Sequence, residues 1–127
     1  MAFVLGKRSL TNLQGVHPDL VKVVKRAIQL SSIDFTVTEG LRTKERQAQL
    51  LKAGASKTMN SRHITGHAVD LAAWVDGGVR WDRPLYAKLA KAMKAAAAEL
   101  KVAIIWGGDW RTLKDGPHFE LDRKVYP

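Results

Sequence analysis

Several features that define other protein classes are missing from this sequence of 127 residues. There is no cysteine, which excludes a disulfide framework and any thiolate metal site. No apolar run is long enough to cross a bilayer, and the first eight residues lack the hydrophobic region of a signal peptide. No internal repeat, low-complexity tract or linker divides the chain. We therefore expect one compact domain over residues 1–127, in which imidazole and carboxylate groups must hold any metal.

The charge of the chain is unbalanced. Lys and Arg outnumber Asp and Glu by 21 to 12, which gives a formal net charge of +9 at pH 7. An excess of this size favours a polyanionic partner such as nucleic acid, anionic lipid or an anionic cell wall. The basic residues are scattered along helical stretches, and no nucleic-acid-binding motif is present. We expect no nucleic-acid partner, although a small basic metal-containing nuclease is an alternative interpretation.

Hydrophobic periodicity predicts helices and short strands in alternation. Helices are expected over residues 16–30, 44–51 and 82–101, with Thr43 and Asp82 as caps of the second and third. Strands are expected over residues 34–39, 68–74, 102–106 and 118–121, and residues 76–81 have the pattern of a hairpin turn and return strand. Because hairpin signals replace regular βαβ units, the pattern indicates an α+β fold, a small mainly antiparallel sheet covered by helices.

Candidate metal ligands lie in two short stretches, residues 61–70 and 115–118. His63, Asp70 and His118 would supply the three protein ligands of a catalytic zinc whose fourth position stays open for water. Asp115, three residues before the last of these, has the character of a general base. Arg42 follows a predicted strand, at a turn from which its charge can face an oxyanion.

A second pairing of histidines competes with this set. His63 and His67 have the spacing of a helical His-x-x-x-His zinc pair. Thr65 and Gly66 disfavour a helix there, and Ile64 stands where a zinc-protease helix would carry glutamate. A binding module with a purely structural zinc is a further alternative, although structural zinc normally has four protein ligands.

One motif connects these residues to a known family. Ser61, His63, Gly66, Ala68 and Asp70 match S-x-H-x-x-G-x-A-x-D without a gap. In this the sequence resembles the zinc D-Ala-D-Ala and L-alanyl-D-glutamate peptidases that cut bacterial peptidoglycan. Residues 5–10, 16–20 and 106–110 resemble the L-alanyl-D-glutamate endopeptidases in particular, so the likeness covers nearly the whole chain.

The resemblance implies roles for individual residues. Asp115 corresponds to the carboxylate three residues before the final histidine ligand, His118, and Arg42 to the arginine of the family. It implies Zn²⁺ as the cofactor and a fold like that of hedgehog signalling domains and D-Ala-D-Ala peptidases. Ser61 and Trp106 are candidate substrate contacts, with a loop cap and a core aromatic as the alternatives. The roles of His67, Asp109 and Glu120 stay open, Glu120 being either support for a ligand histidine or a strand residue facing water.

The implied reaction is hydrolysis of the L-alanyl-D-glutamate bond in the stem peptide of bacterial peptidoglycan. A D-Ala-D-Ala carboxypeptidase or dipeptidase is the alternative. We expect a monomeric phage endolysin that stays in the host cytoplasm until lysis and then reaches the periplasm and cell wall; a cellular wall hydrolase is the other possibility. Without a separate wall-binding domain, the positive charge of the catalytic domain would contact anionic wall polymers or the outer membrane surface.

Overall fold

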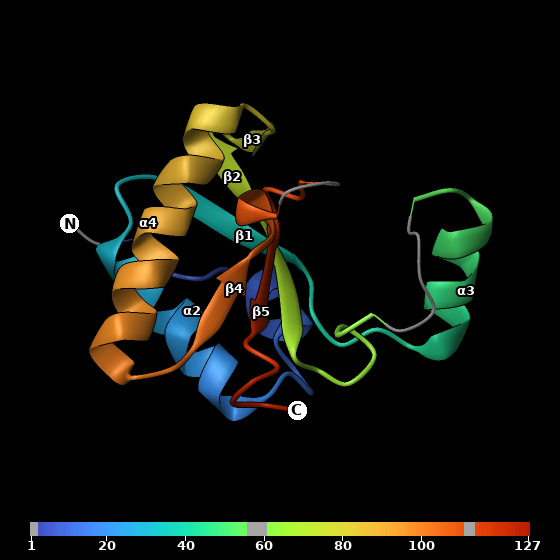
Figure 1. Cartoon of the computed structure of the whole chain (residues 1–127). Coiled ribbons are helices and arrows are strands. Elements are labelled where there is room, and N and C mark those ends of the chain that lie inside the picture. Colours follow the sequence, from blue (N-terminus) through green and yellow to red (C-terminus); the bar gives the residue numbers. More distant parts are fainter. Residues whose placement is uncertain (1–2, 56–60, 111–113) are drawn as a thin grey trace.

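The computed structural model of the chain describes residues 3–55, 61–110 and 114–127. Figure 1 shows how helices and a single sheet follow one another along the chain. The elements in order are α1 (Lys7–Asn12), α2 (Pro18–Leu30), β1 (Asp34–Glu39), α3 (Lys44–Lys52), β2 (Ala68–Val75), β3 (Gly78–Arg80), α4 (Arg83–Leu100), β4 (Ile104–Trp106), the 3₁₀ turn η1 (Gly107–Asp109) and β5 (His118–Leu121). Among these residues, none of the helices has the length and apolar character needed to traverse a bilayer.

The sheet is built around β2. Its strands lie in the order β1-β2-β5-β4, β3 pairs with the far end of β2, and every pairing is antiparallel. Asp34 lies opposite Trp74 in the β1–β2 pair, and His118 lies opposite Asp70 in the β2–β5 pair. The expected α+β architecture with a mainly antiparallel sheet is confirmed.

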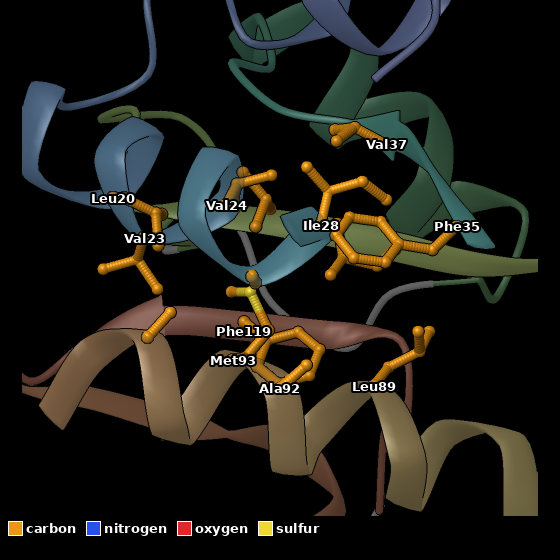
Figure 2. Packing of buried hydrophobic residues seen from close by; sticks show 14 of the residues in the cluster. Leu20, Val23, Val24, Ile28, Phe35, Val37, Leu89, Ala92, Met93 and Phe119 are labelled. Carbon is orange, nitrogen blue, oxygen red and sulfur yellow. The ribbon is translucent and has the colours of Figure 1, made fainter. Parts of the chain in front are cut away.

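The hydrophobic core lies between the sheet and the pair α2 and α4, which pack side by side against one face (Figure 1). Figure 2 shows side chains from α2, α4, β1 and β5 meeting in this layer. Both helices direct an apolar stripe inward, as their period of about 3.6 residues requires. The fully buried side chains include Leu20, Val23, Val24, Val37, Val69, Leu71, Leu89, Met93, Phe119 and Leu121.

The short helix α1 covers the outer edge of β1. The backbone N–H of Val37 donates to Oγ of Ser9 (2.9 Å), and Nδ2 of Asn12 donates to the carbonyl of Val37 (2.8 Å). These side chains satisfy backbone groups that a neighbouring strand would otherwise pair, and so they close the edge of the sheet. Periodicity did not predict α1, because six residues are too few to show an amphipathic repeat.

The helix caps follow the prediction at one site and depart from it at another. Oγ1 of Thr43 accepts a hydrogen bond from the backbone N–H of Arg46 (3.0 Å), so the predicted cap of α3 is confirmed. Asp82 occupies the N-cap position of α4, but its side chain makes no cap hydrogen bond. The predicted position is confirmed, but the carboxylate of Asp82 pairs with the guanidinium of Arg80 and does not bond the backbone of the helix.

Gly66 fixes the loop that precedes β2. Its backbone has φ of +77°, and a Cβ at this position would lie 2.6 Å from the carbonyl oxygen of Gly15. In return, the carbonyl of Gly66 accepts the backbone N–H of His17 (2.8 Å). Only glycine combines this conformation with so close a backbone approach, so the loop is held against the chain that enters α2.

We predict that replacing Gly66 by alanine lowers the free energy of unfolding by more than about 3 kcal/mol, because left-handed strain costs about 1–2 kcal/mol and the clash with Gly15 adds to it. Gly77 is the matched control: its φ is +80°, but nothing lies within 4 Å of a Cβ there. Gly77→Ala should cost only the strain of about 1–2 kcal/mol. Urea titration of both variants measures the difference, and equal losses would contradict the backbone clash.

Candidate metal centre

Three side chains from separate parts of the chain meet on the sheet. His63 comes from the loop before β2, Asp70 from β2, and His118 from the first position of β5. Each of these residues offers one ligand atom, and the three atoms lie within 4.8 Å of one another. Oδ1 of Asp70 is 3.2 Å from Nε2 of His63 and 3.3 Å from Nδ1 of His118. The pairing of β2 with β5 sets two of these positions, and the loop supplies the third.

His63 is held by backbone groups. Its Nδ1–H donates to the carbonyl oxygen of Gly40 (2.9 Å), which leaves Nε2 as the atom that faces Asp70. Its carbonyl accepts the backbone N–H of Arg42 (2.9 Å). The imidazole is almost fully buried, with 2% of the residue exposed. The sequence pattern could not predict this contact between His63 and Gly40. The acceptor is a backbone carbonyl, which every residue has.

His118 is held by a side chain on its own strand. Its Nε2–H donates to Oε1 of Glu120 (2.8 Å), which directs Nδ1 toward Asp70. The two residues are two positions apart on β5 and therefore point to the same face of the sheet. The alternation of side chains along a strand is therefore the sequence signal that favours Glu120 as support for His118 over Glu120 as a residue facing water.

This donor set fits a divalent metal ion. Two imidazole nitrogens and one carboxylate oxygen are the ligands of an open catalytic zinc site with three protein ligands. The second ring nitrogen of each histidine is already bonded to an acceptor, as is usual for metal-bound histidines. Among the residues that the structure describes, this is the group whose ligand atoms lie close enough to share one ion.

The acidic and imidazole groups shift each other's protonation. Burial raises the pKa of Asp70, but hydrogen bonds with His118 and His63 outweigh it and hold the pKa well below its usual range. Burial lowers the pKa of His118, but its bonds with Asp70 and Glu120 outweigh that effect and raise the pKa to about 9. Without a metal, the site therefore holds a proton at His118, and a cation bound there would displace it.

Asp115 lies in the loop just before β5. Its backbone N–H donates to the carbonyl of Gly107 (3.0 Å), and its own carbonyl accepts the N–H of His118 (3.1 Å). A Cβ on Gly107 would lie 2.4 Å from the Asp115 carbonyl oxygen and 3.1 Å from Cβ of His118. The absence of a side chain at Gly107 thus lets this loop approach η1 and places Asp115 beside the ligands.

The carboxyl group of Asp115 is half-buried and has a raised pKa. Burial is the largest cause, and the negative charge of Asp70 adds to it, while the positive groups of the site oppose both. A carboxylate with a raised pKa accepts a proton more readily than an exposed one. The environment therefore suits Asp115 to proton transfer.

Arg42 brings a buried positive charge to the same place. Its Nε donates to Oε1 of Glu39 (2.8 Å) and its Nη1 to Oε1 of Gln47 (2.7 Å). Its Nη2 is 3.7 Å from Oδ2 of Asp70. A β-bulge between Val37 and Glu39 brings Glu39 opposite Asp70. The guanidinium is thus aimed by two acceptors and lies against a candidate metal ligand.

Ser61 and Trp106, the candidate substrate contacts, make hydrogen bonds to the backbone of nearby loops. Oγ of Ser61 accepts the backbone N–H of His63 (3.2 Å). The indole N–H of Trp106 donates to the carbonyl of Gly116 (2.7 Å), and its ring stacks on Phe119 at 6.4 Å between centroids. Both side chains support the loops that carry the site residues, and their contact with a substrate stays a prediction.

His67 lies outside the group of ligand atoms. Its Nδ1 is 2.7 Å from Oγ1 of Thr65, and its ring centroid is 5.5 Å from that of His17. Burial is the main cause that lowers its pKa, and the charge of Arg62 adds to it. Residues 61–67 form turns rather than a helix, so His63 and His67 are not arranged as a helical zinc pair.

A known protein family matches nearly the whole chain. A family model described as phage L-alanyl-D-glutamate peptidase matches residues 1–126. The L-alanyl-D-glutamate peptidase of Escherichia phage T5 is 38% identical over 130 residues, which cover 99% of this chain and 94% of that protein.

Two solved structures are also similar to this chain. The crystal structure of the Serratia marcescens L-Ala D-Glu endopeptidase ChiX superposes with a TM-score of 0.92 at 49% identity, covering 98% of this chain and 94% of that one. The vancomycin resistance D,D-dipeptidase VanXYg, at 19% identity and a TM-score of 0.56 over 84% of this chain and 50% of its own, shares the fold. This chain belongs to the phage L-alanyl-D-glutamate peptidase family.

Proposed function

We propose that this protein is a zinc-dependent endopeptidase that hydrolyses the L-alanyl-D-glutamate bond in the stem peptide of bacterial peptidoglycan. One observation carries the proposal: in a member of this family, His63, Asp70 and His118 bring three ligand atoms within 4.8 Å of one another. The relatives named for this activity match nearly the whole chain, which supports the same bond as the target.

The proposed cofactor is Zn²⁺, which His63, Asp70 and His118 would hold; Nε2 of His63 and Nδ1 of His118 are the ring nitrogens that face Asp70. With three protein ligands, this site would leave a position open on bound zinc, which would lower the pKa of a water molecule there to about 7 and polarise a carbonyl group. With Gly40 and Glu120 on their other ring nitrogens, both histidines present one lone pair to the metal position.

Asp115 is the proposed general base. Its carboxylate would take a proton from the attacking water and pass it to the amide nitrogen of the leaving D-glutamate. Loss of the C–N bond then gives a free amine on D-glutamate and a free carboxylate on L-alanine. The half-buried position beside His118 and the raised pKa support this role.

Arg42 is the proposed partner of the negative charge that develops on the substrate carbonyl oxygen. Its hydrogen bonds to Glu39 and Gln47 orient the guanidinium before substrate arrives, and such preorganised charge acts most strongly in a buried site. Ser61, in the loop of His63, and Trp106, at the end of β4 and bonded to the loop of Asp115, are the proposed substrate contacts.

The similarity to phage peptidases supports a role as an endolysin in host lysis. We propose that the protein waits in the host cytoplasm as a monomer and reaches the periplasm and cell wall when the membrane opens.

Positive charge on α2 and α4 supports electrostatic contact with an anionic wall polymer or the outer membrane surface. These helices turn one side to the core and the other to solvent. Their exposed sides carry Lys22, Lys25, Lys88 and Lys91, and also Lys94, which pairs with Asp109 (2.7 Å). Glu99 is also exposed there, but it pairs with Arg26 (2.9 Å). The solvent side of this helix layer is therefore strongly basic.

The reaction is tested by mass spectrometry of purified peptidoglycan digested with the protein, with and without a chelator. We expect peptides with new D-glutamate amino termini, loss of the products on metal removal, and recovery on addition of Zn²⁺. Release of D-alanine alone would assign the protein as a carboxypeptidase instead. Digestion that a chelator leaves unchanged would contradict the metal site.

The role of Asp115 as the general base is tested with the variant Asp115→Ala. This variant should bind Zn²⁺ as the parent does, because Asp115 is outside the ligand group, and should lose about 10²–10⁴-fold in hydrolysis rate. Asp82→Ala, which removes an exposed carboxylate beside Arg80, is the control and should keep full activity. Hydrolysis at the parental rate in Asp115→Ala would remove this residue from the mechanism.

Wall contact is tested by binding of the inactive Asp115→Ala protein to sacculi as salt rises. Affinity should fall steeply between about 0.1 and 1 M salt, where the screening length shrinks from about 10 to about 3 Å. Replacing Lys22, Lys25, Lys88 and Lys91 by glutamine should remove most of this salt dependence. The same change at Lys7, Lys44, Lys52 and Lys124 is the charge-matched control; binding that is insensitive to salt would refute the electrostatic contact.

A further inference from the structure

We propose that Glu120 is a positioning residue for the metal ligand His118: it holds the proton of the imidazole on Nε2, so that Nδ1 is the nitrogen presented to the metal. The inference rests on the metal centre of the proposed function, but it concerns metal binding rather than the bond that is cut. Neither the ligand group nor the general base includes Glu120.

The first support is the contact itself. Oε1 of Glu120 is 2.8 Å from Nε2 of His118, and each residue is only 7% exposed. A carboxylate accepts hydrogen bonds and does not donate them when ionised, so Nε2 must carry the hydrogen. The remaining ring nitrogen, Nδ1, is the one that lies 3.3 Å from Oδ1 of Asp70.

The second support is that the carboxylate of Glu120 is itself held in place. Its Oε2 lies 4.0 Å from Nε of Arg62 and 3.8 Å from Nε of Arg123. The guanidinium of Arg62 is anchored in turn, because Nη2 donates to the carbonyls of Leu121 (3.2 Å) and Tyr126 (2.7 Å). The buried Nε of Arg62 has no hydrogen-bond acceptor among the residues that the structure describes, and the carboxylate 4.0 Å from it is that of Glu120.

The third support is a contrast between the two histidine ligands. His63 gives its second ring proton to a neutral acceptor, the carbonyl of Gly40, whereas His118 gives it to a charged one. Hydrogen bonds to ionised acceptors are about twice as strong as neutral ones and make the imidazole a more basic ligand. Glu120 therefore adds both orientation and negative charge to one side of the metal position.

The same geometry excludes Glu120 as a direct ligand in this arrangement. Its Oε1 is bonded to Nε2, whereas Nδ1, across the imidazole ring, is the nitrogen that faces Asp70. Its other oxygen faces Arg62 and Arg123. Glu120 is therefore connected to the metal position through the imidazole of His118 and does not contact it directly.

The test measures the dissociation constant for Zn²⁺ by competition with a chromophoric chelator, using the full chain. We expect binding to weaken about tenfold in Glu120→Gln, which keeps an acceptor but loses the charge, and about 100-fold in Glu120→Ala, which loses both. Glu99→Gln is the control, because it neutralises a glutamate whose partner is the distant Arg26. It should bind Zn²⁺ as the parent does.

Urea titration of each metal-free variant separates positioning from folding. If Glu120→Ala does not fold, the conservative Glu120→Gln decides the question. Parental affinity for Zn²⁺ in folded Glu120→Gln would overturn the proposal, since the charged acceptor would then be dispensable.

A second measurement identifies directly which ring nitrogen of His118 carries the hydrogen. In the ¹⁵N-labelled, zinc-loaded parent, long-range ¹H–¹⁵N NMR should show the hydrogen of His118 on Nε2 and the metal on Nδ1. The opposite assignment would overturn the proposal. Both readouts are independent of hydrolysis, so a protein that binds Zn²⁺ as described but cuts no L-alanyl-D-glutamate bond would refute only the proposed function.

Discussion

The metal centre depends on the antiparallel pairing of β2 with β5. This register places Asp70 opposite His118, so that two residues 48 positions apart in the chain become neighbours on one face of the sheet. On the opposite face of β2, Val69 and Leu71 are fully buried in the core. A slip of one residue would exchange the two faces of the strand and bury Asp70 among apolar side chains. Packing against α2 and α4 therefore specifies the position of the ligands as well as the fold.

The third ligand depends on close backbone approach. Two glycines beside His63, one in its loop and one at the end of β1, leave no room for a side chain. A Cβ on Gly66 would lie 2.6 Å from the Gly15 carbonyl oxygen, and one on Gly40 would lie 2.0 Å from that of Asn12. Gly40 also supplies the carbonyl that binds Nδ1 of His63. The same segments that bring the loop against the body of the protein therefore also orient the imidazole.

The sequence allowed the strands, the large helices and the spacing of the ligand residues to be predicted, because each depends on a local pattern. Helix α1 was not predicted, because its place depends on bonds from Ser9 and Asn12 to Val37 across the fold. Motif spacing likewise named His63 and His118 but not which ring nitrogen of each is presented. That choice depends on partners that a pattern of residue types does not identify, a backbone carbonyl for one histidine and Glu120 for the other.

Carboxylates gather at the metal centre although the protein as a whole is strongly basic. The net charge is +9, and lysines on the solvent side of α2 and α4 contribute to it, yet Asp70, Asp115 and Glu120 gather around the ligand atoms. Exposed charges are screened beyond about 8 Å at physiological salt, whereas buried groups in contact are screened much less. A cation at the ligand atoms therefore interacts mainly with the charges beside it, the carboxylates that attract it and the guanidinium of Arg42 that opposes them. The positive outer surface and a cation-binding interior are compatible in one small domain because their interactions act over different distances.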